Sequence, residues 1–295
     1  MKWIKRKMFL SLMLIGLLVG LASPVQAASN TIIVYGEQLS DSQRQEVLDA
    51  LNMSESDAFE EHVVTGEDYQ NYIDGNPSSN MYSSARIVLE DEGAGITVNI
   101  LTPSNITKVS KEMYENALLT AGAENATVDV VSPVRVTGES ALTGIYKAYD
   151  AEGEQLDKER MVLANDELEV ATDLAENEGV SQEDVSQLLT DIKKQLAEQN
   201  PVTREEVEQI VEEQLANLEI SLSEEDRQML IDLVDRMRNL EIDFGAMRDQ
   251  LDEIANNLVD RAEELGLDQG FWEKVANFFS DLFQALSDFF RGLFN

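Results

Sequence analysis

The chain has 295 residues, with 22 Lys and Arg, 57 Asp and Glu, one His and no Cys, and its formal net charge is −35. Such a negative field repels a polyanion, which excludes a nucleic-acid-binding protein that works by neutralising phosphates. Without cysteine the chain has no disulfide framework and no thiolate nucleophile, while a hydrophobic content of 43% is enough for a folded core.

The first 27 residues have the three parts of a secretory signal peptide. A basic segment over residues 2–7 precedes an apolar run over residues 8–21, and the side chains that follow place cleavage between Ala27 and Ala28. A transmembrane anchor is the alternative, but the run is short for a hydrocarbon core that needs about 20 residues. We therefore expect a protein that is secreted, extracellular or associated with the cell envelope.

Residues 28–152 alternate strand-like and helix-like segments, which is typical of an α+β domain. Ser40 and Gln43 have the spacing of a capping box, and Gly122 is placed to end a helix. The Gly-containing segment 90–95 predicts a β-hairpin. Strands are predicted at 31–35, 62–65, 86–89, 96–101 and 126–131, and helices at 41–52, 69–73, 109–121 and 142–149.

Residues 153–266 lack strand patterns and predict an all-α helical region, organised as a bundle or a hairpin. Helices are expected at 155–176 and 182–198, the second one capped by Ser181. Thr203 and Glu206 form the capping box of the next helix.

Apolar residues from Leu230 to Leu258 recur at alternating spacings of three and four, which predicts one helix with heptad periodicity. At 1.5 Å per residue this helix would be about 43 Å long. It could pack on the helices at 182–198 and 203–219 of its own chain, or it could form a coiled coil in a homo-oligomer through residues 230–258.

Residues 267–295 predict a Phe-rich amphipathic helix that follows a Gly-containing break. At 100° per residue, the large apolar side chains occupy one half of the circumference and every charged side chain occupies the other. The apolar half is the candidate membrane-binding or partner-binding surface. It consists of Phe271, Trp272, Val275, Phe278, Phe279, Leu282, Phe283, Leu286, Phe289, Phe290, Leu293 and Phe294.

Three partners could cover this apolar half: the body of the same protein, a membrane interface, or another protein, including a second copy of the chain. Five charges within residues 271–295 argue against a helix that spans a bilayer. The high Phe content favours an interfacial helix at the outer face of the membrane or a contact with an envelope protein. Because the segment carries a net charge of −1, membrane binding would have to be hydrophobic.

The sequence offers few candidates for chemistry, and we assign no catalytic residue, no cofactor and no metal site. His62 is the only imidazole, and its neighbours Glu60 and Glu61 favour a structural or solvated role. Ser140 lies between Gly138 and Gly144 without the spacing of a nucleophile elbow, so a turn and helix cap is expected there. Diffuse calcium binding by acidic clusters stays open.

The alternative function is a hydrolase of wall polymer or peptide that uses carboxylates of residues 28–152. It requires a concave site in which two carboxyl groups have pKa values pushed apart. The number of acidic residues is too large to single out one pair.

Several stretches resemble a known family. They include Tyr35-Gly36, Gly95-Ile96-Thr97-Val98, Met113 to Leu118, Thr120-Ala121-Gly122 and Ala141-Leu142-Thr143-Gly144. Over roughly residues 30–260 the chain resembles the YpuA-like family (domain of unknown function 1002) of secreted proteins from Gram-positive bacteria. The resemblance implies an exported protein in an envelope setting, with no established activity. We therefore expect a cell-envelope protein that is not an enzyme.

Overall fold

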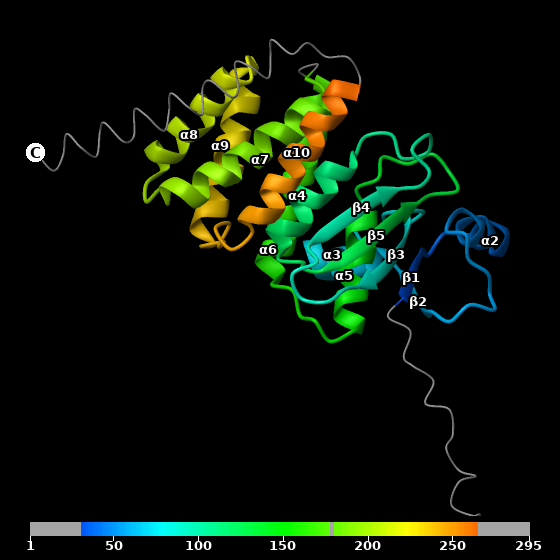
Figure 1. Cartoon of the computed structure of the whole chain (residues 1–295). Helices are drawn as coiled ribbons and strands as arrows, with labels where there is room; N and C mark the ends of the chain where they lie inside the picture. The colour runs from blue at the N-terminus through cyan, green and yellow to red at the C-terminus, as the bar shows by residue number, and fades with distance from the viewer. Residues whose placement is uncertain (1–30, 178–179, 265–295) are drawn as a thin grey trace, which may run out of the picture. The chain divides into compact units, whose positions relative to one another are not determined.

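The computed structural model describes residues 31–177 and 180–264, which lie within one compact unit that begins at Thr31 (Figure 1). A five-stranded sheet occupies the N-terminal half, and the later part is mostly helical. None of the described helices is long and apolar enough to cross a lipid bilayer. The predicted signal peptide and the predicted Phe-rich helix lie outside the described residues.

The five predicted strands are all present and form one mixed sheet in the order β2-β1-β3-β5-β4. β1 is parallel to β2, β4 is parallel to β5, and β3 runs antiparallel to both of its neighbours, β1 and β5. A helix connects each parallel pair, α2 the first and α4 the second, as parallel pairing requires. The strands are β1 (Thr31–Gly36), β2 (Glu60–Val64), β3 (Ser84–Leu89), β4 (Ile96–Ile100) and β5 (Ala126–Val131), and the helices are α2 (Asp41–Ala50) and α4 (Lys111–Ala121).

The predicted hairpin between residues 86–89 and 96–101 is wrong, because β5 lies between β3 and β4 and pairs with both. The segment 90–95 reverses the chain but spans two strand spacings, about 10 Å, which six residues reach easily. Asn125, just before β5, holds this segment by accepting hydrogen bonds from Gly93 N (2.8 Å) and Gly95 N (3.2 Å) on its Oδ1. The turn residues therefore set the reversal of the chain, whereas the pairing of β3 and β4 is set by β5.

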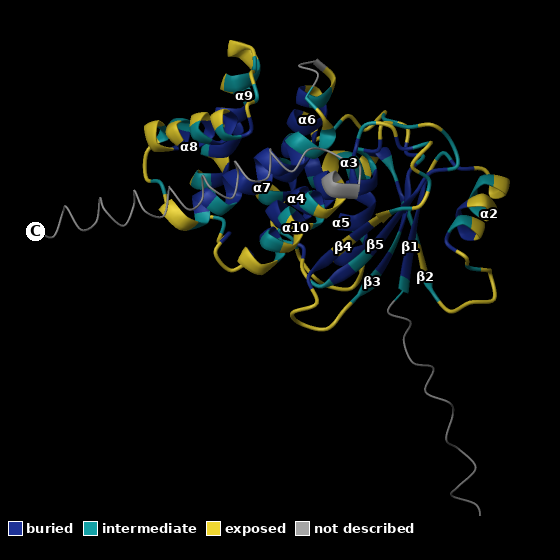
Figure 2. Ribbon diagram, turned by 45° about the horizontal axis from the view of Figure 1, so that its top comes forward, coloured by how far each residue is buried: buried dark blue, intermediate teal, exposed yellow. Residues whose placement is uncertain are grey.

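Both faces of the sheet are buried. Successive side chains along β1 point to opposite faces, and each face packs in a core of its own. Ile33 and Tyr35 pack with α2 in a smaller core, whereas Ile32 and Val34 belong to a larger one. The larger core also contains residues of α3 (Gly66–Ile73), α4 and α5 (Ala141–Ala151). Figures 1 and 2 show α2 alone at one side of the sheet, with α4 and α5 on the other.

β2 and β4 are the two edge strands of the sheet. Along β2, Glu60 and Glu61 expose their carboxylates to solvent. Along β4, the outward backbone N–H of Val98 donates to Glu115 Oε1 of α4 at 3.1 Å. Both edges therefore carry acidic side chains. Those of β2 face solvent, whereas Glu115 at β4 accepts a backbone hydrogen bond.

The caps predicted at Ser40, Gly122, Ser181 and Thr203 are confirmed. Ser40 and Gln43 form a capping box, and so do Thr203 and Glu206. Ser181 Oγ accepts a hydrogen bond from Asp184 N at 3.0 Å. Gly122 follows α4 with φ 82°, a left-handed conformation that glycine adopts without strain. The later helices are α6 (Lys158–Asn177), α7 (Gln182–Gln199), α8 (Arg204–Asn217), α9 (Glu224–Asn239) and α10 (Arg248–Glu264).

The prediction of one continuous helix over residues 230–258 is wrong. α9 ends at Asn239 and α10 begins at Arg248, and Glu241 between them has φ 50°. The heptad positions from Leu230 to Leu258 nevertheless pack in the larger core of the same chain, Leu240 with part of its side chain exposed. The pattern survives the break because the connecting segment also places Phe244 and Met247 in that core. Packing within one chain accounts for the pattern, and a homo-oligomer through this segment stays a prediction.

The larger core extends past residue 152, where we predicted a domain boundary. From Glu112 to Ala121 every residue of α4 is buried, and this helix contacts β4 as well as α6, α7 and α10. The sheet and the later helices therefore share one apolar cluster.

Candidate functional site

The residues proposed from the sequence to contact a membrane or partner, Phe271 to Phe294, lie outside the described residues. The same holds for Ala27 and Ala28 at the proposed cleavage site. The described residues can still be searched for an exposed apolar surface on which the predicted Phe-rich helix could dock.

That surface has little exposed apolar area. Among the described residues, only two large hydrophobic side chains are exposed, Leu101 (39%) and Val202 (75%). The apolar stripes of α7, α8, α9 and α10 are buried in the larger core, together with residues of the sheet and of α4 to α6. On residues 31–177 and 180–264 there is thus no bare apolar face that matches a wide Phe-rich helix.

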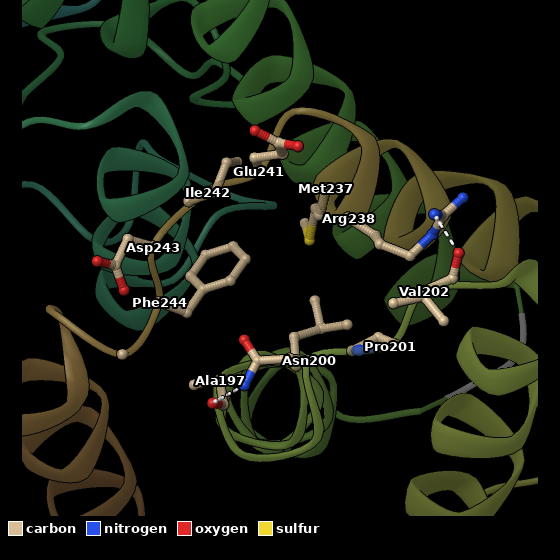
Figure 3. A pocket seen from close by; sticks show the side chains of 12 residues that line it. Ala197, Asn200, Pro201, Val202, Met237, Arg238, Glu241, Ile242, Asp243 and Phe244 are labelled. Atoms are coloured by element: carbon tan, nitrogen blue, oxygen red, sulfur yellow. Dashed lines mark hydrogen bonds between the residues drawn. The ribbon is translucent and has the colours of Figure 1, made fainter.

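Val202 borders a hollow of about 590 Å³ between the end of α7 and the α9–α10 connection (Figure 3). Met237 and Phe244 line it on the α9–α10 side, and Arg238 Nη1 donates to the carbonyl of Val202 at 3.0 Å. Asn200 ends α7 at φ 47° and turns the chain along the rim. Met237 and Phe244 make one part of the hollow apolar, and Glu241 and Asp243 add two carboxyl groups to its lining.

A buried polar cluster joins α4, α6 and α7. Lys193 Nζ lies 2.5 Å from Glu167 Oε1 and donates to the Asn116 carbonyl at 2.7 Å, and both charged side chains are almost fully buried. Thr120 Oγ1 donates to Glu167 Oε2 at 2.5 Å. Burial lowers the pKa of Lys193, against the attraction of Glu167. Because both charges are hydrogen-bonded and sealed from solvent, the cluster holds three helices together and does not act on a substrate.

The buried carboxyl groups of residues 28–152 each have an identifiable structural partner. Asp129 pairs with Arg86, and Glu112 accepts from Arg261 Nη1 at 3.3 Å. Burial raises the pKa of Glu115 to about 7, with the Val98 N–H as its hydrogen-bond donor and Oε2 left without a partner. Glu115 is packed against β4 through this hydrogen bond. This arrangement gives no support to a two-carboxylate hydrolase.

The two other sequence candidates, His62 and Ser140, make structural contacts. His62 lies on the edge strand β2 with Nε2 2.9 Å from Glu60 Oε1. Ser140 precedes α5, but its side chain makes no cap hydrogen bond, so the predicted cap is wrong in this respect. The reason is its helical φ and ψ (−65°, −14°), since a capping side chain needs an extended residue. Its hydroxyl donates instead to Ser83 Oγ at 3.3 Å.

The described residues contain no group of three or more His, Cys, Asp or Glu side chains that could hold a metal ion.

Comparison with known proteins gives a family. The profile of the family described as "Protein of unknown function (DUF1002)" matches residues 35–254, a range that begins near the end of β1 and includes the other four strands and most of the later helices. "Uncharacterized protein YpuA" of Bacillus subtilis (strain 168) is 31% identical over 273 residues, which cover 90% of this chain and 91% of that protein. No solved structure matches.

Proposed function

Since the chain belongs to the DUF1002 family of proteins of unknown function, no activity can be taken over from its relatives, and we propose a function from its own residues. The protein is an exported, non-enzymatic component of the cell envelope. Its C-terminal amphipathic helix binds the outer face of the membrane or a partner protein.

The observation that carries this proposal is the closed surface of the body. A helix with twelve large apolar side chains on one half needs a partner surface of similar size. The described residues expose only Leu101 and Val202 among their large hydrophobic side chains, so they offer no such surface. This favours a partner outside the chain over docking on the body.

Charge decides which kind of membrane contact is possible. Residues 28–295 have a formal charge of −39, so anionic lipid repels the protein, and binding depends on apolar burial. A fully buried Phe side chain contributes about 1.5–3 kcal/mol, and exposed charges beyond about 10 Å are screened by salt. Binding should therefore be insensitive to added salt or strengthened by it.

The test is co-sedimentation of residues 28–295 with zwitterionic vesicles. We expect the triple variant Phe279→Gln, Phe283→Gln, Phe290→Gln to bind at least about tenfold more weakly, because each substitution removes a buried ring. The matched control, Asn277→Gln, Ser280→Gln, Ser287→Gln, changes the polar half of the same predicted helix and should bind like the wild type. Equal binding by the two variants would exclude the membrane version.

The partner version is tested with the same variants. If zwitterionic vesicles do not retain the wild type, chemical crosslinking on intact Gram-positive cells should give an adduct that the Phe triple variant lacks. An adduct of unchanged yield in that variant would overturn the role of the helix. Export predicts that the mature N-terminus isolated from the culture or the envelope is Ala28.

A further inference from the structure

A second hollow, of about 890 Å³, lies where the end of β4, the starts of α4 and α7 and the last turns of α10 meet. Three cationic side chains line it, Lys111, Arg135 and Arg261, together with one acidic side chain, Asp260. Four other hollows of the described surface each have more acidic than basic side chains in their lining. An excess of cations is unexpected in a chain with 57 acidic and 22 basic residues.

The cations of this hollow retain unused hydrogen-bond donors. Arg135 is exposed, and among the described Lys and Arg side chains it alone makes no ion pair and no hydrogen bond. Lys111 Nζ lies 3.8 Å from Glu112 Oε1, too far for a hydrogen bond. Arg261 is partly neutralised, since Glu112 and Glu183 lie 3.3 Å and 3.9 Å from its guanidinium nitrogens. Lys111 and Arg135 are therefore the groups that can take a new partner.

Three neutral donors of the lining are already engaged. Asn99 Nδ2 donates to Asp129 Oδ1 at 2.9 Å, and Thr107 Oγ1 donates to the Val136 carbonyl at 3.0 Å. Gln182 Nε2 donates to the Lys108 carbonyl at 2.7 Å. At these three side chains a neutral polar ligand would have to displace existing hydrogen bonds, whereas an anion would find free charged donors on Lys111 and Arg135.

One side of the hollow is apolar. Ile100, Leu101, Pro103, Ile106 and Val109 contribute to its lining. Leu101 is one of the two exposed large hydrophobic side chains of the described residues, so this wall is accessible to a ligand. The volume is also larger than a bare oxyanion needs and lies in the range of pockets for small organic ligands.

We propose that this hollow binds a phosphate group carried by a small organic molecule. Arg135 provides the planar pair of N–H donors that suits two phosphate oxygens, and Lys111 provides a point charge. A phosphate monoester has enough oxygens and charge to use both cations at once, whereas a carboxylate has two oxygens and one charge. The organic part lies against the wall that contains Leu101. The positive end of α4 adds to the potential. This site does not depend on the C-terminal helix.

The test is a calorimetric titration of residues 28–295, carrying the Phe triple substitution so that membrane association cannot interfere. The probes are inorganic phosphate, butyl phosphate and butyrate. We expect saturable millimolar or tighter binding in the order butyl phosphate, phosphate, butyrate, and weaker binding at higher salt. Vesicles that contain phosphatidic acid distinguish a lipid-borne phosphate from a soluble one, because only the former would retain this variant.

Charge-matched variants locate the site. Arg135→Gln and Lys111→Gln should each weaken butyl phosphate binding about tenfold, the usual effect of one charge-assisted hydrogen bond. Arg248→Gln removes the same charge from a side chain outside the hollow that pairs with Glu198 at 2.6 Å, and it should change binding less than about twofold. No saturable binding of any phosphate probe, or equal losses in Arg135→Gln and Arg248→Gln, would overturn the proposal.

Discussion

Glu115 and Lys193 are buried ionisable side chains on neighbouring helices, but they differ in their partners. Lys193 has a carboxylate and two amide oxygens around its ammonium group. Glu115 has one backbone N–H on Oε1 and nothing on Oε2. Because the Lys193 charge is fully paired and the Glu115 charge is not, we expect removal of the first charge to destabilise the fold and removal of the second to stabilise it.

Removing the Glu115 charge should stabilise the protein at alkaline pH. Burial raises the pKa of this carboxyl from 4.5 to about 7, so the folded state keeps a proton that the unfolded chain releases. Stability therefore falls as pH rises from about 4.5 to about 7, by up to about 3 kcal/mol. Glu115→Gln should unfold at higher urea concentration than the wild type at pH 8 and at a similar one at pH 5.

Glu112→Gln is the control for this prediction, since Glu112 is also buried on α4 but pairs with Arg261. It should not gain stability at pH 8. A Glu115→Gln protein that is less stable than the wild type at pH 8 would contradict the assigned cause.

Removing the Lys193 charge should have the opposite effect. Lys193→Met leaves Glu167 buried without its cation, at a cost of about 3–5 kcal/mol in the free energy of unfolding. The double variant with Glu167→Gln should recover part of this loss. Lys194→Met, which removes the neighbouring, partly exposed partner of Asp252, should cost at most about 1 kcal/mol. Urea unfolding of the four proteins measures all three differences.

At the scale of single elements, local chemistry was predictable and pairing was not. The caps of α2, α7 and α8 follow from residues three positions apart, so the sequence alone is enough to find them. The insertion of β5 between β3 and β4 depends on contacts between residues thirty or more positions apart, which a turn motif does not encode. The heptad pattern over 230–258 correctly predicts which side chains are buried. It does not predict the break in the helix, because the α9–α10 connection also buries Phe244 and Met247.

The break between α9 and α10 makes a prediction at Glu241. Its φ of 50° is left-handed, a region where glycine is unstrained, and its side chain is exposed. Glu241→Gly should therefore leave stability unchanged or raise it by up to about 1 kcal/mol. In a continuous helix the same substitution would lower it by about 1 kcal/mol. Thermal unfolding of the variant, with Glu241→Ala as the comparison, decides between the two structures by the sign of the change.

At the scale of the whole molecule, the buried helix α4 connects the sheet to the later helices. Its residues from Glu112 to Ala121 depend on α6 and α7 for cover. We expect a fragment of residues 28–152 to lack a cooperative thermal transition by circular dichroism, whereas residues 28–264 should show one. A fragment 28–152 that unfolds cooperatively would instead support the predicted domain boundary at residue 152.

The two candidate binding surfaces differ in how far the sequence predicts them. The Phe-rich half of residues 271–294 follows from one helical period within a single segment. The cation-lined hollow combines Lys111, Arg135 and Arg261 from three distant places, and no spacing in the sequence relates them. The burial of Lys193 is visible in the sequence, since this residue lies four positions after Leu189 and three before Leu196, on the apolar stripe of α7.

The acidic side chains at the borders of the sheet bear on self-assembly. A strand with free backbone groups is a template to which another copy can add, and such addition leads to fibrils. On β2 this would bring the like charges of Glu60 and Glu61 from two copies together, and on β4 Glu115 already occupies the Val98 amide. We therefore expect the protein to resist polymerisation through its edge strands.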